Sequence, residues 1–299
     1  MNATEILKQL SDALAARTAA ASAMIGAVRV SEEKYLTATL WQSELALASE
    51  QSLPKRDAFE LVLPGGSTVS AKLAGRDPGT NIALLRLAQP VSLPPISSAA
   101  AQSGALALAF GADGAGGATM RLGVVNLAGP QWWSSAGGRI DQRIVLDMRL
   151  ARAEEGGPVL DATGARLGIT TFGARGEILV IPAATIDRVV PALLADGQIA
   201  RGWLGLMLQP VAVPDALKPE AGQPSGLMVM SIVDDGPAAK AGLVAGDIVL
   251  TLNGAPARRV RSLAKQLASE SIGRTADLRV IRGGKVVSLQ AVIEARRAA

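Results

Sequence analysis

The period of hydrophobic and polar positions changes along the chain, and each change predicts a different kind of element. The N-terminal segment has a helical period, so we expect an amphipathic helix over residues 3–20, which Asn2 or Thr4 could cap. The polar face of this helix is not basic, which favours packing of its apolar stripe on the protein's own body rather than on a membrane. The apolar stripe consists of Ile6, Leu7, Leu10 and Leu14.

From about residue 24 the pattern becomes one of short apolar or alternating runs separated by glycine, proline and aspartate. Runs such as "YLTATLW", "NIALLRLA" and "GEILVIPA" are typical of strands joined by tight turns, and they predict an all-β barrel or paired barrels. A helical period returns in "PAATIDRVVPALLADG", where Gly197 provides a C-terminal stop. The apolar face of this helix comprises Ile186, Val189, Val190, Leu193 and Leu194. A second set of strands follows it, so we place a domain boundary here.

The composition bounds the possible functions. A chain of 299 residues suggests two domains, and the net charge of +4 comes from scattered lysines and arginines rather than from a stripe. A nucleic-acid partner is therefore not expected. The chain has no cysteine and no histidine. These absences exclude disulfides, thiol catalysis, histidine metal ligands and a Ser-His-Asp triad, and we expect no metal and no cofactor.

The N-terminus lacks the basic start and unbroken apolar segment of a secretory signal, and no apolar run is long enough to span a bilayer. We therefore expect a cytoplasmic protein as the sequence is written, or a periplasmic one if its N-terminus is truncated.

Three segments in the same order resemble bacterial HtrA/Deg-type serine proteases, and a fourth resembles their PDZ domain. They are "LAGRDPGTNIALLRL" (73–87), "VLDMRLARAEEGGPVLDATGARLGITT" (145–171), "IPAATIDRVVPALLADGQIARGWLGLMLQPV" (181–211) and "SIVDDGPAAKAGLVAGDIVLTLNG" (231–254). The resemblance implies a mainly β protein: a trypsin-like double six-stranded β-barrel followed by one PDZ domain. The implied limits are 1–20 for the N-terminal helix, 21–198 for the double barrel and 199–299 for the PDZ domain.

At the positions that match the triad of this family, the chain carries different residues. The resemblance places the histidine position at Leu40, the aspartate position at Asn81 and the nucleophile position at Glu155. The glycine whose amide serves the oxyanion hole corresponds to Ala153. Leucine cannot accept a proton, and a carboxylate opposes a developing oxyanion, so we predict a non-enzyme, a pseudoprotease. The alternative is a divergent hydrolase that uses carboxylates or a residue supplied by a partner.

Glu155 allows two interpretations. Its carboxylate could fold back onto the amides of the "EEGGP" turn as an internal substitute for the oxyanion, or it could point to solvent, which we favour slightly. The adjacent Glu154 and Glu155 could serve as an acid and base, but a solvated or capping pair is the simpler interpretation.

The PDZ segment retains the features of a peptide-binding module. PDZ domains add a peptide strand to a sheet edge and hold its terminal carboxylate on backbone amides, here expected in "RGWLGLMLQ" (201–209). A groove helix is expected over 260–269, with Leu263 and Leu267 facing an aliphatic pocket. The expected peptide-binding residues are Trp203, Leu204, Gly205, Leu206, Leu208, Leu263 and Leu267.

We therefore expect an adaptor, chaperone-like or regulatory protein in bacterial protein quality control. Its partners would be peptides or protein C-termini with an apolar end, together with an active homologous protease. A PDZ fold that only packs on the barrels is the simpler alternative. Trp132 and Trp133 are expected in a loop, either as a contact surface or wedged between the barrels, and an oligomer is compatible with the sequence.

Overall fold

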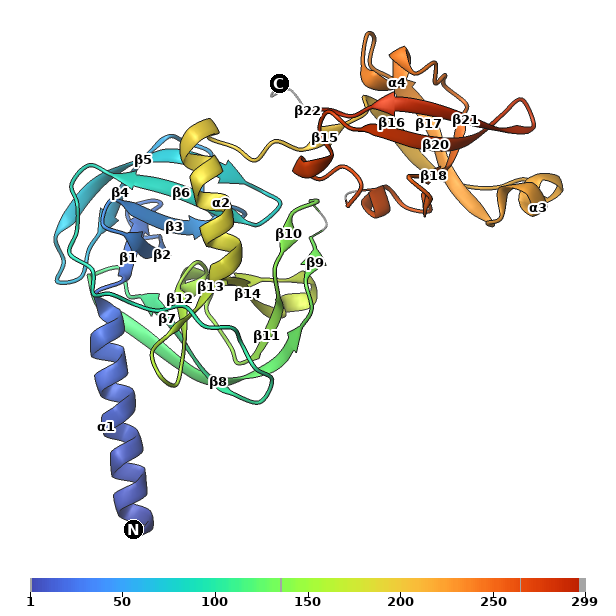
Figure 1. Ribbon diagram of the computed structural model, residues 1–299. Coiled ribbons are helices and arrows are strands. Elements are labelled where there is room, and N and C mark those ends of the chain that lie inside the picture. The colour runs from blue at the N-terminus through green and yellow to red at the C-terminus, as the bar shows by residue number, and fades with distance from the viewer. Residues whose placement is uncertain (1, 135, 264, 296–299) are drawn as a thin grey trace. The chain divides into compact units, whose positions relative to one another are not determined.

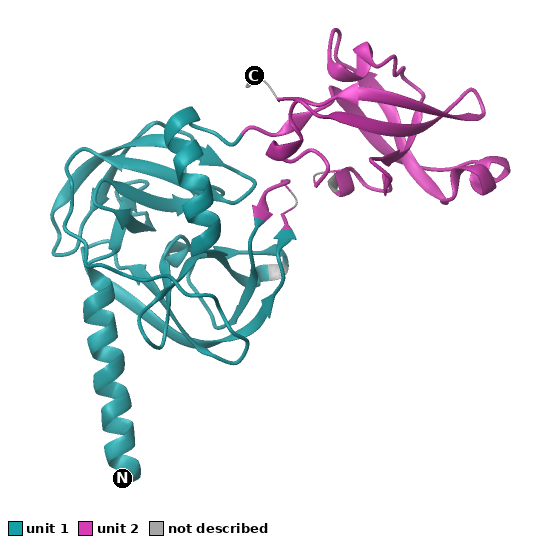
Figure 2. Ribbon diagram, in the orientation of Figure 1, with its two compact units in different colours: residues 1–132, 140–199 teal, residues 133–139, 200–299 magenta. Residues whose placement is uncertain are grey.

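The computed structural model describes residues 2–134, 136–263 and 265–295, and it is mainly β (Figure 1). The chain divides into two compact units (Figure 2): residues 1–132 and 140–199 form unit 1, and residues 133–139 and 200–299 form unit 2. The domain limits expected from the sequence stay a prediction.

The first half of unit 1 is a closed antiparallel barrel with strand order β1-β2-β3-β6-β5-β4. Its interior is mainly aliphatic: side chains such as Leu40, Leu61 and Leu85 fill it, together with Phe59. The strands are β1 (Ile25–Arg29), β2 (Tyr35–Gln42), β3 (Leu45–Ser49), β4 (Ala58–Val62), β5 (Thr68–Asp77) and β6 (Ile82–Leu87).

The second half of unit 1 is another closed barrel with strand order β11-β14-β13-β12-β7-β8. The expected pair of six-stranded barrels is therefore confirmed. The strands are β7 (Leu106–Ala112), β8 (Ala118–Gly129), β11 (Arg143–Asp147), β12 (Pro158–Asp161), β13 (Arg166–Phe172) and β14 (Ile178–Pro182). Two 3-10 turns, η1 (Arg152–Glu154) and η2 (Ala174–Gly176), lie in the connections. Strand β9 (Trp132–Trp133) pairs separately with β10 (Arg139–Ile140), and residues 133–139 of this hairpin are assigned to unit 2.

The N-terminal helix α1 (Ala3–Ser22) is confirmed, and Asn2 caps it by accepting a hydrogen bond from the Glu5 amide at 2.8 Å. The expected packing of its apolar stripe is wrong for most of its length. Ile6, Leu7 and Leu10 are 48%, 66% and 45% exposed, whereas Leu14 and the C-terminal end of the helix at Ala21 pack on the barrel. Each barrel closes on itself and fills its own core, so no sheet face is left for the helix, which projects outwards (Figure 1). None of the described helices combines the length and apolarity needed to cross a membrane.

Helix α2 (Ala183–Asp196) joins the two barrels. Its buried residues Ile186, Val189, Val190 and Leu193 pack in one cluster with Trp41 from β2, Leu47 from β3 and Ile181 from β14. The helix ends at Gly197, which has a φ of 69° and donates its amide to the Leu193 carbonyl at 3.0 Å. Leu194, expected on the same face, is instead 36% exposed.

Trp132 is half-buried and packs against this interbarrel cluster. Of the two interpretations of this residue, the structure therefore agrees with a wedge between the barrels and not with an exposed contact surface. Trp132 and Trp133 form β9 instead of lying in an irregular loop.

Unit 2 contains an antiparallel sheet in the order β16-β17-β18-β20-β21, with β16 at one edge. The strands are β16 (Leu206–Ala212), β17 (Ser225–Ile232), β18 (Ile248–Leu252), β20 (Thr275–Arg282) and β21 (Lys285–Val292), and β19 (Ala255–Pro256) pairs with β18. Strand β15 (Gly202–Trp203) pairs separately with β22 (Glu294–Ala295). The helical segments are η3 (Asp215–Leu217), α3 (Lys218–Ala221), α4 (Pro237–Lys240), η4 (Val260–Leu263) and η5 (Ser269–Ser271).

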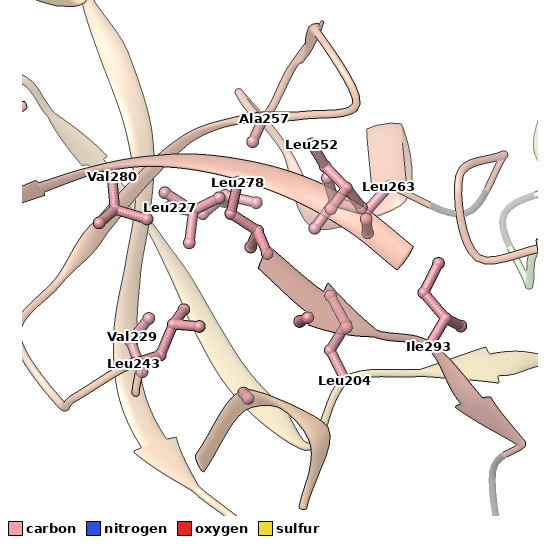
Figure 3. Packing of buried hydrophobic residues seen from close by; sticks show 14 residues of the cluster. Leu204, Leu227, Val229, Leu243, Leu252, Ala257, Leu263, Leu278, Val280 and Ile293 are labelled. Atoms are coloured by element: carbon pink, nitrogen blue, oxygen red, sulfur yellow. The ribbon is translucent and has the colours of Figure 1, made fainter. Parts of the chain in front are cut away.

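The groove helix expected over 260–269 does not form as one helix in the described part of this segment. The 3-10 turn η4 covers Val260–Leu263, and a single turn follows in which the Leu267 amide donates to the Leu263 carbonyl at 3.0 Å. Residue 264 lies outside the described residues. Leu263 and Leu267 are four residues apart, which is the spacing of one helical turn. Short turns are also compatible with "VRSLAKQLAS", and they place Leu263 in the core, as Figure 3 shows.

Candidate functional site

Asn81 lies at the end of the turn before β6, with a φ of 56°, and its side chain connects three segments. Its Oδ1 accepts a hydrogen bond from the amide of Gln51 at 2.7 Å. Its Nδ2 donates to Thr171 Oγ1 at 2.6 Å and to Ser49 Oγ at 3.0 Å. The Asn81 side chain therefore holds the segment after β3 of the first barrel, and it also bonds to Thr171 in β13 of the second barrel.

Glu155 is buried, with 1% of its surface exposed, and its carboxylate accepts hydrogen bonds from both barrels. Gln51 Nε2 donates to Oε1 and Ser52 Oγ donates to Oε2, both from the segment after β3. Thr171 Oγ1 donates at 3.0 Å and the Phe172 amide at 3.1 Å, both from β13. The interpretation of Glu155 as a solvent-exposed residue is therefore wrong.

The amides of the "EEGGP" turn bond to carbonyls, not to this carboxylate. The Glu154 amide donates to the Ala151 carbonyl at 3.0 Å, and the Glu155 amide donates to the Arg152 carbonyl at 3.4 Å. Ala153 lies within η1, and its carbonyl accepts from Thr37 Oγ1 at 2.6 Å. The internal-oxyanion interpretation is thus wrong too, because the side chain extends away from its own turn towards the first barrel.

Glu154 points away from Glu155 and binds different partners. Its carboxylate accepts from the Ala151 amide at 2.7 Å, from Thr119 Oγ1 at 2.8 Å and from Arg121 Nε at 3.1 Å. This is the capping arrangement considered for the pair, with an added ion pair to Arg121. The two glutamates consequently do not form an acid–base pair.

Leu40 is not part of this network. It is 1% exposed and belongs to the core of the first barrel, and its amide donates to the Met24 carbonyl at 2.7 Å. In a Ser-His-Asp triad the histidine lies between the aspartate and the nucleophile. Between Asn81 and Glu155 the structure places Gln51 and Ser52, so the histidine position expected at Leu40 is corrected to the segment after β3.

Gln51 and Ser52 were not among the predicted site residues, because they lie in "QSELALASEQSLPKRDAFE", a stretch after the strand "YLTATLW" that carries no motif of its own. The available signal was the apolar run "LALAS", which forms the fully buried strand β3 and pairs with β2 and β6.

In unit 2, Leu204 and Gly205 form the short loop that joins β15 to β16, which is named the Trp203–Leu206 loop after its flanking residues. Gly205 has a φ of 75°, which favours glycine. The carbonyl of Leu204 accepts from the Ala238 amide and that of Gly205 from the Val233 amide, both at 2.9 Å. Within the described residues, the amides of Leu204 and Gly205 have no acceptor. Successive free amides at a left-handed residue are suited to binding an anion.

Beside this loop, β16 offers a free edge next to η4. Leu204 and Leu263 are buried in the core of unit 2 (Figure 3). Leu206, Leu208 and Leu267 pack against that core but remain partly exposed. The Gly202 amide donates to the Leu267 carbonyl at 2.9 Å, which fixes the start of the loop to the turn after η4. The expected peptide-binding residues therefore lie around one loop and one sheet edge.

Comparison with known proteins gives the family. Residues 27–169 match the trypsin-like peptidase domain and residues 202–293 match the PDZ domain. The chain belongs to the HtrA-type family. Two solved structures titled "HtrA-type protease AlgW", one with a decapeptide and one with a tripeptide, share its fold. The decapeptide complex is 24% identical to this chain, has a TM-score of 0.71, and matches over 95% of this chain and 99% of its own. The tripeptide complex is 25% identical, has a TM-score of 0.69, and matches over 95% of this chain and 98% of its own.

Three curated relatives are each named "Probable periplasmic serine endoprotease DegP-like". The protein of Brucella suis biovar 1 is 33% identical over 80% of this chain and 48% of its own length. Those of Rhizobium meliloti and Pseudomonas putida are each 31% identical, over 76% and 80% of this chain and 46% and 51% of their own lengths. The chain thus spans about half the length of the curated relatives it matches.

These relatives correct one expectation. We predicted that the chain is not an enzyme, and the prediction is contradicted because the relatives that match about four-fifths of it are named serine endoproteases. They are also named periplasmic, so the comparisons give the expected cytoplasmic location no support. The chain still contains no histidine, so hydrolysis by this chain would require groups other than a Ser-His-Asp triad.

Proposed function

We propose that this HtrA-type protein binds the C-terminal segment of partner polypeptides through its PDZ domain. The observation that supports this most strongly is the loop Trp203–Leu206, where the amides of Leu204 and Gly205 are free while their carbonyls are anchored to the Ala238 and Val233 amides. A terminal carboxylate would bind these two amides, and the peptide strand would pair with the free edge of β16. The two AlgW structures are titled as complexes with a decapeptide and a tripeptide, which supports peptide binding by a protein of this fold.

The last side chain of the peptide would pack on the partly exposed Leu206, Leu208 and Leu267, over a base formed by Leu204 and Leu263. All five are leucines, so the surface offers dispersion and burial but no polar side chain. Burial of an aliphatic or aromatic side chain stabilises a complex by about 1.5–3 kcal/mol, whereas a charged side chain would lose its hydration. We infer that the C-terminal residue of the partner is apolar.

A library of peptides with randomised C-termini, presented to the full chain, tests this proposal. We expect selection of peptides that end in an apolar residue, and loss of binding when the same peptides carry a C-terminal amide. Substitution Leu267→Asp should abolish the selection, whereas Val292→Asp, at an exposed position of the opposite edge strand β21, should not. Selection of internal segments, or binding that is indifferent to amidation, would contradict the proposal.

For the compartment, we propose the periplasm, because the relatives are named as periplasmic proteins. Fractionation of cells that express the full-length gene tests this, and recovery of the protein only with the cytoplasmic fraction would contradict it.

A second candidate function is hydrolysis by the pair Ser52 and Glu155. The Ser52 hydroxyl donates to the Glu155 carboxylate, and a hydroxyl next to a base is the arrangement of an activated nucleophile. In this scheme Ser52 Oγ attacks the scissile carbonyl carbon while its proton passes to Glu155. Glu155 then protonates the leaving amine as the C–N bond breaks, and water hydrolyses the resulting ester and regenerates the hydroxyl. The partial burial of Ser52 and the full burial of Glu155 mean that substrate entry would require the segment after β3 to open.

Cleavage of an unfolded casein-type substrate tests this second candidate. Activity that survives repurification and is lost in both Ser52→Ala and Glu155→Gln, but not in Ser70→Ala on the exposed side of β5, would support it. Activity that Ser52→Ala leaves unchanged would rule out the pair as the source.

A further inference from the structure

The segment between β19 and η5, residues 257–268, carries positive charges only. It includes three arginines and one lysine and contains no aspartate or glutamate, and the next acidic residue is Glu270 in η5. Arg258, Arg259 and Lys265 are exposed. These residues flank η4, which lies next to β16. The cations therefore border the groove that the proposed peptide would occupy.

The other side of that groove is uncharged. Strand β16 has the sequence "LMLQPVA", and its neighbour β17 has "SGLMVMSI", so neither strand offers a counter-ion. Asp234 and Asp235 directly follow Val233, whose amide donates to the Gly205 carbonyl, so they adjoin the loop proposed to hold the terminal carboxylate and not the remainder of β16. A peptide that adds to the free edge would thus run between an uncharged strand and a cationic segment.

We propose that this groove selects peptides that carry aspartate or glutamate upstream of their apolar C-terminal residue. The inference rests on the proposed peptide binding and adds the charge of the ligand. In a β-paired peptide, successive side chains point to opposite sides, so those next to η4 lie two residues apart along the peptide. Acidic side chains at alternating positions upstream of the C-terminus would approach Arg258, Arg259 and Lys265, while the terminal side chain occupies the leucine surface.

Fluorescence anisotropy with three labelled peptides tests the proposal. The peptides share one apolar C-terminal residue and differ only upstream, where they carry two glutamates, two glutamines or two lysines. We expect the glutamate peptide to bind about three to ten times more tightly than the glutamine peptide at low salt, and the lysine peptide to bind most weakly. The difference should shrink as salt is raised, because ions screen exposed charges.

Two double variants of the full chain assign the effect to the cationic segment. Arg258→Gln with Arg259→Gln should remove most of the preference for glutamate while leaving the affinity for the glutamine peptide unchanged. The matched control, Arg279→Gln with Lys285→Gln, removes the same charge from exposed positions on β20 and β21, away from β16, and should retain the preference.

The outcomes separate this inference from the proposed function. Equal affinity for all three peptides, or an equal loss of preference in both double variants, would overturn the selection for acidic peptides and leave peptide binding intact. Binding of none of the three, or binding of the glutamate peptide that is unchanged by C-terminal amidation, would overturn the proposed function and this inference together.

Discussion

The Ser52 hydroxyl donates a hydrogen bond to the carboxylate of Glu155, which links the segment after β3 in the first barrel to the turn before β12 in the second. Gln51, Thr171 and the Phe172 amide complete the set of donors. A buried carboxylate is thus satisfied by donors from both barrels, at the position expected from the sequence to match the nucleophile of the family. This connection leads to a stability prediction.

Replacing Glu155 with alanine should destabilise unit 1 by about 3 kcal/mol, because it leaves buried donors without an acceptor. At about 2–4 °C per kcal/mol for a unit of this size, the melting temperature should fall by about 6–12 °C. Differential scanning calorimetry of the full chain measures the shift.

The matched control is Glu177→Ala, which removes a half-exposed carboxylate that pairs with Arg143 at 3.7 Å. Such a surface pair contributes little, so the change should stay within about 1 kcal/mol. Equal effects of the two substitutions would show that the Glu155 network does not stabilise the barrels.

Gly157 should tolerate no side chain. A Cβ at this position would lie 1.8 Å from the Phe110 carbonyl oxygen, and backbone atoms cannot yield as a flexible side chain can. Gly157→Ala should therefore lose soluble protein or lower the melting temperature of unit 1 by at least as much as Glu155→Ala.

Gly129→Ala is the control, because there the nearest atom to a new Cβ, Arg143 Cβ, is 3.5 Å away. If Gly157→Ala melted like the wild type, the packing described here around the "GGP" segment would be incorrect.

Asp247 should make the stability of unit 2 decrease as the pH falls through the acid range. Burial raises the pKa of its carboxyl, but hydrogen bonds from Arg282 at 2.6 and 2.8 Å and from the Val244 amide at 3.0 Å outweigh this and leave the pKa below its ordinary value of 3.8. A lowered folded-state pKa stabilises the fold above the unfolded-state pKa, and this contribution is lost as the pH falls through the folded-state pKa.

Calorimetry from about pH 6 down to about pH 2.5 should therefore show a constant melting temperature for unit 2 near neutrality and a fall below about pH 4. Asp247→Asn should lower the melting temperature at neutral pH and flatten this dependence. An equally steep fall in Asp247→Asn would assign the acid sensitivity to other groups.

Gly205→Ala should weaken peptide binding. A non-glycine residue at a φ of 75° costs about 1–2 kcal/mol, and the new Cβ would lie 3.3 Å from the Trp203 ring, so the loop amides should shift. We expect the affinity for a C-terminal peptide to fall by about fivefold or more in an anisotropy titration.

Gly222→Ala is the matched control, because Gly222 has a φ of 71°, ends α3 and has no neighbour within 4 Å of a new Cβ. It should cost similar backbone strain but leave peptide affinity unchanged. A similar loss of affinity in both variants would show that strain in unit 2, and not the position of the loop, causes the effect.

Sequence patterns predicted the elements well where local periodicity and tertiary packing agree. In α2, Ile186, Val189 and Val190 recur at helical spacing, Gly197 ends the helix, and the packing on both barrels uses that face. The same periodicity in α1 predicted the helix correctly but not its environment, because Leu7 and Leu10 have no sheet face left to cover.

The site was harder to predict, since it is assembled from segments that are far apart in the chain. Asn81 and Glu155 follow from motifs, but the partners that satisfy them, Gln51 and Ser52, lie in a segment without a motif of its own. The direction of the Glu155 side chain depends on donors supplied by Thr171 and the first barrel, which no local pattern specifies. For the same reason, the helical spacing of Leu263 and Leu267 did not reveal that η4 ends early.

The most direct test of the proposed function is the affinity of the full chain for one selected peptide as its free acid and as its C-terminal amide. The amidated peptide should bind at least about tenfold more weakly than the free acid, since amidation removes the charge that the backbone amides of Leu204 and Gly205 would bind. Equal affinities would contradict the assignment of the Trp203–Leu206 loop as a carboxylate site.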